Sequence, residues 1–268
     1  MHGESRAEAT SATTGLCRIL VALFAIVTTT FPLAPALADC NDDPKPNVDW
    51  SGCHKVRLVM PGADFSGGTF DEAFFTSTDL SNADFSEANL GRVELSMASL
   101  AGANLASAVL EKAMGTRTDF SGADLRNANL VAAQFARSGF KNTNLAGADM
   151  RNSEMNRSDF SGADLTGANI SRAELARIVL SGAKISKVTF SYSNLSRSDL
   201  RETNLNDADL TGTYMFLTRL DGADLSGTTG LVDAQIALAC GTDKTKLPAG
   251  IASPQKWPCP DYDAEEDG

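Results

Sequence analysis

The side chains that most often carry out catalysis or hold metals are scarce in this chain, which has five cysteines and two histidines. His54 is the only histidine beyond residue 38, so a Ser-His-Asp or Cys-His arrangement in that part of the chain would depend on it. Its neighbour Cys53 is expected to be oxidised rather than a free nucleophile. The sequence has no glycine-rich phosphate-binding loop, and its aspartates recur evenly instead of converging in pairs. We therefore expect no enzyme and no cofactor.

Four cysteines form two pairs near the ends of the chain, a spacing that suits disulfide chemistry. The pairs are Cys40 with Cys53 and Cys240 with Cys259. Four cysteines allow three pairings, and Cys40–Cys53 with Cys240–Cys259 is favoured because the long segment between the pairs should hold the ends apart. A structural zinc site is the alternative, but it needs convergent ligands at short spacing and no C-x-x-C pair is present. We expect no metal.

A set of regularly spaced arginines is the strongest candidate for binding chemistry. Five of them recur at an interval of 20 residues, namely Arg117, Arg137, Arg157, Arg177 and Arg197. If residues 20 apart become neighbours, repulsion between adjacent guanidinium groups amounts to roughly 0.9 kcal/mol in water. Asp119, Asp159 and Asp199 are placed to pair with three of the arginines, which leaves Arg137 and Arg177 the freest. The set is either a solvated salt-bridge ladder left by duplication or an anion-binding strip roughly 19 Å long for a polyanion.

These residues belong to a long repeat with a period of five. From Phe65 to Leu225 every fifth residue, a repeat centre, is large and apolar except Gly115, and a small residue commonly stands two positions earlier. Neither the 3.6-residue period of a helix nor the 2-residue period of a strand fits this pattern. A chain that turns a corner every five residues does fit, because four sides then close a square coil of 20 residues. Successive coils would stack at a strand-like spacing of about 4.8 Å.

The repeat units read A-D-F-S-G, A-N-L-A-S, A-D-L-R-N, A-D-L-T-G and A-D-L-S-G. They resemble the pentapeptide repeat family, whose pattern is A-[D/N]-[L/F]-x-x, and the resemblance spans residues 62–228 of 268. It implies an all-β fold, a right-handed quadrilateral β-helix of about eight coils, between short N- and C-terminal caps. It implies little about function, because most members have none assigned and a fold does not determine a function.

Comparing residues 20 apart predicts which side chains stack in neighbouring coils. Phe120, Phe140 and Phe160 should form one aromatic column, and Phe65 and Phe85 another. Glycine and asparagine tolerate positive φ, so a column in which these two types recur is expected to mark a corner of the square. That column consists of Gly62, Asn82, Gly102, Gly122, Asn142, Gly162, Gly182 and Gly222.

Gly115 is the one repeat centre without a side chain. Its absence should leave a void next to Leu95 and Phe135, unless Met114 or Phe135 fills the space. A small-molecule pocket at this position is the alternative.

Residues 1–38 read as an export signal. Arg18 precedes an apolar run from Ile19 to Phe31, and Ala36-Leu37-Ala38 has the small-x-small pattern of a cleavage site. The run is short for a membrane span, so we expect cleavage after Ala38 and no stable membrane span afterwards. An uncleaved anchor, or a lipoprotein modified at Cys40, is the alternative.

The repeat is expected to be closed at both ends. Residues 39–61 read as a leader and N-terminal cap whose register begins at Val48, with Lys55 as a misfit. Residues 229–268 read as a C-terminal cap with a short helix over 231–239 and an acidic tail. The outward positions become apolar near this end, and an apolar cluster usually indicates contact. Docking of the cap explains that contact patch and a homodimer interface is the alternative; its residues are Tyr214, Phe216 and Leu217.

These features favour a non-catalytic, exported scaffold of the cell envelope that is periplasmic or secreted. Its partner would be an envelope protein or polymer that the sequence does not identify. The alternatives are a binder of an anionic envelope polymer through the arginines and, with less support, a nucleic-acid mimic that protects a topoisomerase, as some members of the family do. Nucleic acid itself is an unlikely partner for a chain with a formal net charge of −11.

Overall fold

A computed structural model of the chain describes residues 38–259. The chain divides into two units, Met1–Ala36 and Leu37–Gly268, and the described residues belong to the second. The predicted export signal, apart from Ala38, and the acidic end of the tail therefore lie outside the described residues.

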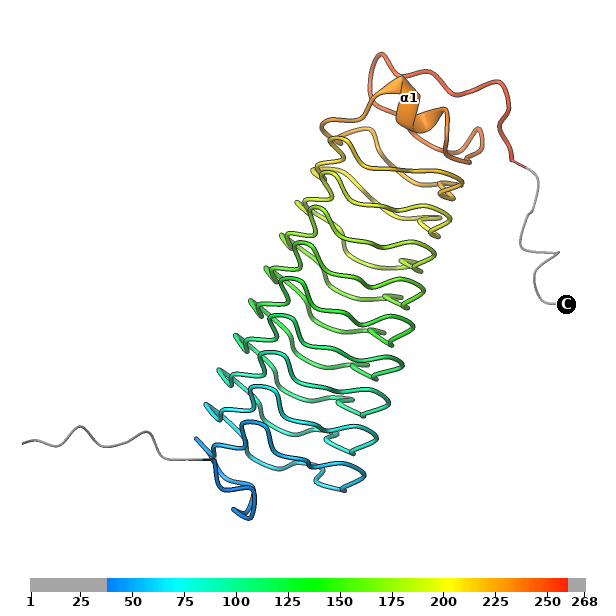
Figure 1. Cartoon of the computed structure of the whole chain (residues 1–268). Coiled ribbons are helices and arrows are strands. Elements are labelled where there is room, and N and C mark those ends of the chain that lie inside the picture. Colours follow the sequence, from blue (N-terminus) through cyan, green and yellow to red (C-terminus); the bar gives the residue numbers. More distant parts are fainter. Residues whose placement is uncertain (1–37, 260–268) are drawn as a thin grey trace, which may run out of the picture. The chain divides into compact units, whose positions relative to one another are not determined.

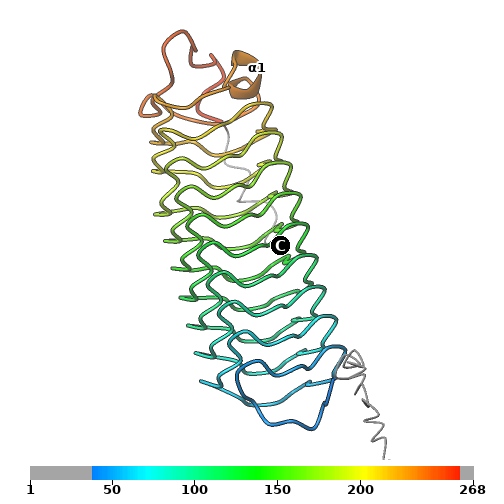
Figure 2. The same ribbon diagram turned by 90° about the vertical axis from the view of Figure 1, so that its left-hand side faces the viewer.

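The second unit is a β-helix solenoid, a stack of coils in which the chain bends every five residues (Figure 1). Parallel bridges join residues 20 apart, beginning with Asp49 to Thr69 and continuing up to Asp209 to Thr229. Each bridge is a single residue long, so no extended strand forms and every backbone pair links one coil to the next. Figure 2, turned by 90°, shows the same regular stacking. The predicted coil of 20 residues is confirmed.

The interior of the stack consists of the repeat centres and the small residues two positions before them. The centres Phe120, Phe140 and Phe160 are 0–2 % exposed and stack face to face, with ring centroids 5.0 and 4.6 Å apart. Phe65 and Phe85 stack in the same way at 4.8 Å. Both aromatic columns predicted from the interval of 20 are therefore confirmed. Because the centres point inward, the residues on either side of each centre face outward.

The corners have backbone in the left-handed region. The predicted column of glycines and asparagines has positive φ throughout, for example +69° at Gly62 and +58° at Asn82. The same conformation recurs at the other corners, where it is adopted by residues as different as Glu87, Lys112 and Arg117. The corner geometry therefore does not select for glycine alone, although glycine adopts it at the lowest cost.

Where an Asp or Asn precedes a centre, it stabilises the corner that follows. Its side-chain oxygen accepts a hydrogen bond from the backbone N–H two residues later, as in Asp64 to Ser66 at 3.0 Å and Asn104 to Ala106 at 3.2 Å. This is an Asx turn, which Asp and Asn form readily because their side chains are short. The second position of the repeat thus has a local backbone role.

Gly115 leaves no void. A Cβ placed there would lie 2.3 Å from the Thr118 hydroxyl and 2.9 Å from the Phe135 ring, so these two side chains already occupy the space. Met114 points outward and is 42 % exposed. The predicted filling by Phe135 is confirmed, whereas filling by Met114 and a small-molecule pocket at this position are wrong.

Restoring the missing centre by Gly115→Leu should therefore destabilise the protein, by about 1–3 kcal/mol as an overpacking change. Thr118 is held in place because its hydroxyl donates to the Leu95 carbonyl at 2.9 Å. Denaturant unfolding measures the loss. Removing the Thr118 hydroxyl as well, in Gly115→Ala with Thr118→Ala, should recover part of the loss caused by Gly115→Ala alone. A more stable Gly115→Leu protein would mean that a void exists after all.

The first coil begins where the sequence predicted, with Val48 and Trp50 buried at 1 % and 0 %. The ammonium group of Lys55 lies 3.6 Å from the centre of the Trp50 ring, a cation–π contact that accommodates the misfit residue. Partial burial lowers the pKa of Lys55, and the nearby aspartates oppose that shift only in part. Later in this coil Leu58, at an inward position of the repeat, is 39 % exposed. The N-terminal cap expected over residues 39–61 stays a prediction.

The C-terminal end is closed by residues 229–259, which we call the C-terminal cap. It contains the helix α1, Asp233–Ile236, at the end of the stack in Figure 1. α1 is shorter than the predicted 231–239, because Leu238 already pairs with the last coil by accepting from the Leu217 N–H at 2.8 Å. The buried Gln235 donates to the carbonyls of Leu210 and Thr213 at 2.7 and 3.0 Å, which fastens the cap to the coil below.

Candidate functional site

The structure places the five arginines in one column at a corner of the stack, and we call this column the arginine ladder. Its members are Arg117, Arg137, Arg157, Arg177 and Arg197. All five have φ between +57° and +63°. The backbone N–H of each donates to a carbonyl in the next coil, as in Arg137 to Asn156 at 2.9 Å. Side chains at equivalent corner positions of adjacent coils therefore leave the stack from the same corner.

The predicted pairing of the ladder with aspartates is wrong. Asp159 pairs with Lys141 at 3.1 Å, and Asp199 pairs with Arg201 at 2.5 Å. Asp119 accepts from the Ser121 N–H at 2.9 Å. The reason is the Asx turn, which directs each carboxylate toward the corner after it, whereas the ladder lies at the corner before it.

These new partners hold the carboxylates in the charged form. Partial burial opposes ionisation of Asp199, but the hydrogen bonds and charge of Arg201 outweigh it and leave the pKa of Asp199 below its ordinary value. The pKa of Asp159 is lowered in the same sense, against partial burial, by Ser161 and Lys141. Both aspartates are thus committed as charged groups to cations outside the ladder.

Three guanidinium groups of the ladder consequently make no ion pair within residues 38–259. They belong to Arg117, Arg137 and Arg157, and all three residues are exposed. Arg177 was expected to be free, but it is engaged in an interaction, as is Arg197. Three exposed arginines at the spacing of adjacent coils can offer planar, charge-assisted hydrogen bonds to carboxylate or phosphate groups.

The predicted contact patch is only partly exposed. Tyr214 and Phe216 are 49 % and 39 % exposed, and their rings stack with centroids 6.3 Å apart. Leu217 is half-buried because the cap covers its backbone through Leu238. Tyr192, which sequence reasoning missed, is 64 % exposed at a corner. Its large aromatic side chain in a corner column that otherwise holds charged or small residues was the signal that could have identified it.

The cysteines form the two disulfides that the spacing favoured, Cys40–Cys53 and Cys240–Cys259. Cys53 is therefore not a nucleophile. His54 stacks on Phe74, with ring centroids 4.4 Å apart. Among the described residues, no group of three or more His, Cys, Asp and Glu side chains is placed to hold a metal ion.

Comparison with family models establishes the relationship. A model of pentapeptide repeats in eight copies matches residues 62–96, 94–130 and 193–229, and a model of a pentapeptide repeat region matches 113–190. The chain belongs to the pentapeptide repeat family. A search for similar curated proteins gave no match.

Several solved structures resemble this pentapeptide repeat protein. HetL from the cyanobacterium Nostoc, a pentapeptide repeat protein involved in regulating heterocyst differentiation, is 27 % identical over 70 % of this chain and 92 % of its own, with a TM-score of 0.27. The plasmid-mediated fluoroquinolone resistance protein QnrB1 is 16 % identical over 75 % and 92 % of the two chains, with a TM-score of 0.38. A pentapeptide repeat protein of the Arabidopsis thaliana thylakoid lumen is 27 % identical over 40 % and 65 %, with a TM-score of 0.25.

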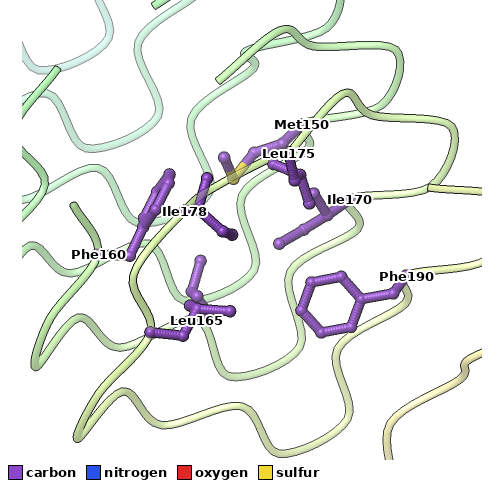
Figure 3. Close-up of a pocket in the computed structure, with 8 residues that line it drawn as sticks. Met150, Phe160, Leu165, Ile170, Leu175, Ile178 and Phe190 are labelled. Atoms are coloured by element: carbon purple, nitrogen blue, oxygen red, sulfur yellow. The ribbon is translucent and has the colours of Figure 1, made fainter. Parts of the chain in front are cut away.

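A narrow gap, shown in Figure 3, lies in the core of the solenoid between apolar side chains of adjacent coils. Ile178 replaces a small residue there, since the equivalent positions one coil away hold Ser158 and Ser198. Buried apolar walls supply nothing that could orient a ligand, so this is a packing gap rather than a binding site. The lining residues are Met150, Phe160, Leu165, Ile170, Leu175, Ile178, Leu180 and Phe190.

Residues 38–259 also contain no helix that is long and apolar enough to cross a membrane.

Proposed function

We propose that this pentapeptide repeat protein is a non-catalytic interaction scaffold exported to the cell envelope, where it binds an envelope protein or polymer. In this proposal the repeat forms a right-handed, four-sided rod of about eight coils that presents flat faces to a partner. The supporting observation is the regular backbone pairing between coils, which recurs from residue 49 to residue 246 although no bridge joins Lys184 to Asn204. Such pairing fixes outward side chains at regular spacing on a rigid support, which favours recognition by an extended surface.

Export is supported by the two disulfides, because such bonds persist in oxidising compartments and are rare in the cytosol. Each disulfide lies at one end of the repeat. Residues 1–38 have the composition of a cleavable signal.

We expect the protein isolated from the cell to be found in the envelope or secreted fraction, with a mass that begins at Asp39. Cell fractionation followed by intact-mass measurement tests this expectation. A cytoplasmic protein whose mass includes residues 1–38 would contradict the exported scaffold. A pull-down of the mature protein from an envelope extract would then identify its partner.

A second candidate function is binding of a polyanion at the arginine ladder. The observation in its favour is that Arg117, Arg137 and Arg157 make no ion pair within the described residues. Against it, the ladder lies in a chain with a formal net charge of −11. Binding would therefore be local and strongly dependent on salt, because exposed charges are screened beyond about 10 Å at 0.1 M.

Titration with inorganic polyphosphate at low salt tests the second function. The triple variant Arg117→Ala, Arg137→Ala, Arg157→Ala should lose any binding that the ladder provides. A matched control removes three cations from other corners, in Lys112→Ala, Arg172→Ala, Lys187→Ala; their φ values of +56°, +59° and +58° keep the corner geometry comparable. Equal loss in both variants would show that net charge, not the ladder, governs binding.

Mimicry of a nucleic acid is not proposed. A mimic of duplex DNA needs a face of one sign, whereas outward positions here hold pairs of opposite charge. Asp124 pairs with Arg126 at 2.6 Å, and Asp149 pairs with Arg151 at 2.7 Å. These pairs lie in successive coils near the middle of the stack and interrupt any continuous acidic surface.

A further inference from the structure

One side of one pair of coils differs from the coil pairs before and after it. On this side the N–H of a repeat centre normally donates to a carbonyl of the next coil, as Leu165 does to Lys184 at 2.9 Å. Leu205 makes the equivalent bond at 2.8 Å two coils later. Between these two levels residues 182–187 lie next to residues 202–207, and we call this junction the seam.

No backbone hydrogen bond crosses the seam in the part of the chain that the structure describes. The N–H groups of Ile185 and Asn204 do not donate across it, and no bridge joins Lys184 to Asn204. The other three sides of the same two coils remain paired at 2.8–2.9 Å, through the N–H groups of Leu180, Phe190 and Leu195. The two coils are therefore separated at one side only.

Two side chains at the seam show the same separation. The hydroxyl of Thr143 donates to the Phe120 carbonyl of the preceding coil at 2.7 Å. Thr203 occupies the same position of its own coil, but its hydroxyl donates to Leu200 within that coil at 2.6 Å. Ala183 is 8 % exposed, whereas the next alanine on either side at this position is 0 % exposed. Solvent thus reaches an inward position at the seam.

Bulky residues in the core explain why the coils separate here. Val188 stands between Ala168 and Ala208 of the neighbouring coils, and Thr203 is likewise flanked by alanines. Both side chains are buried, at 1 % and 3 % exposure. Thr143 is also flanked by alanines and its coil keeps every bond to its neighbours, so a threonine alone does not open a side. Val188, on the adjoining side, supplies the additional volume, and an overpacked core relieves itself by backbone shifts.

We propose that the solenoid has a hinge at the seam, which opens and closes at this side while the other three sides stay paired. Closing the seam forms the missing backbone bonds but compresses Val188 and Thr203, so the two arrangements are close in energy. The rod is rigid on either side of the hinge. The hinge therefore changes the angle between the arginine ladder, in the coils before the seam, and Tyr214 with Phe216, in the coil after it. This inference goes beyond the proposed function, because it holds whichever partner binds.

Residue-resolved amide hydrogen exchange of the full chain tests whether the seam is open. We expect the amides of Ile185 and Asn204 to exchange at least about tenfold faster than that of Leu165, because local opening determines exchange. The repaired variant Val188→Ala, Thr203→Ala should slow them to the rate of Leu165. The control Thr143→Ala removes the same hydroxyl from a fully paired coil and should leave both rates unchanged. Equal protection of Ile185, Asn204 and Leu165 in the unmodified protein would overturn the proposal.

Distances between spin labels test whether the seam moves. One pair, Ser107→Cys with Asp207→Cys, spans the seam, and the control pair, Glu87→Cys with Lys187→Cys, ends before it. All four residues are exposed in one corner column with φ between +58° and +66°, and each pair spans five coil spacings, roughly 24 Å. A Cys17→Ser background leaves only the new thiols reactive, because the remaining cysteines form disulfides.

Double electron–electron resonance should give a broader distance distribution, with a longer component, for the pair that spans the seam than for the control pair. In the repaired variant the two distributions should become equally narrow. A distribution across the seam as narrow as that of the control would overturn the hinge. A longer mean distance would then indicate a fixed bend. A broad distribution that the repaired core leaves unchanged would also contradict the proposal, because the motion would not arise from Val188 and Thr203.

Discussion

Replacing Phe140 with alanine is expected to lower the free energy of unfolding by about 3–5 kcal/mol. Phe140 is fully buried, and its ring stacks between Phe120 and Phe160 with centroids 5.0 and 4.6 Å away. The coils on either side cannot close the resulting cavity, because each is fixed by backbone bonds such as Phe140 N–H to the Asp159 carbonyl at 2.7 Å. The cost should therefore lie near the upper end for a cavity mutation.

Denaturant unfolding of Phe140→Ala, compared with two controls, provides the measurement. Phe140→Leu should lose much less, because leucine is the commonest repeat centre in this chain. Asp64→Ala should also lose much less, because Asp64 is exposed and supports only its own corner through Ser66. Similar losses for Phe140→Ala and Asp64→Ala would contradict the assignment of inward and outward positions.

Removing either disulfide is expected to cost about 3 kcal/mol in the chain-entropy model. The bonded cysteines are 13 residues apart in Cys40–Cys53 and 19 apart in Cys240–Cys259, so the two loops are similar in size. Paired alanine substitutions avoid leaving an unpaired thiol, and Cys53 is fully buried, so alanine also avoids burying a new hydroxyl. Thermal and denaturant unfolding of the two double variants measure the effect.

Peptide mapping without reductant checks the premise of this prediction. We expect only the two bonds within each end of the chain. Four free thiols, or bonds between the two ends, would contradict both the pairing and the estimated loss. Addition of reductant should destabilise the unmodified protein. It should leave unaffected a variant in which all four bonded cysteines are replaced by alanine. This comparison separates loss of the disulfides from other effects of the substitutions.

The sequence was sufficient to predict the path of the backbone. A five-residue period admits few structures, so the coil, the buried centres such as Phe140 and the corner at Gly62 could all be derived from spacing. The partners of the charged side chains could not be derived from spacing. Asp159 and Asp199 stand two residues after an arginine, which suggested a pair, yet the Asx turn directs them to Lys141 and Arg201 instead. The hydrogen bond of the Asx turn determines which cation each aspartate meets. That hydrogen bond can be recognised only when the geometry of the corner is known.

At Gly115 the sequence left a void, a pocket and a filled space open for a different reason. The missing side chain in the pattern suggested a void, but the Phe135 ring and the Thr118 hydroxyl occupy that space. Periodicity gives the position of each Cα and says nothing about which rotamer a neighbour adopts.

Backbone pairing that joins each coil only to the next one has a consequence for how the protein comes apart. In such a one-dimensional stack the boundary between folded and unfolded chain advances coil by coil, and it starts most easily at an end. The C-terminal end is closed by the cap and the Cys240–Cys259 bond, whereas the opposite end exposes Val59 and is held by Cys40–Cys53. Opening in the middle would break two interfaces at once instead of one. Unfolding should therefore be directional, beginning at the first coil, and slow as long as the bond there is intact.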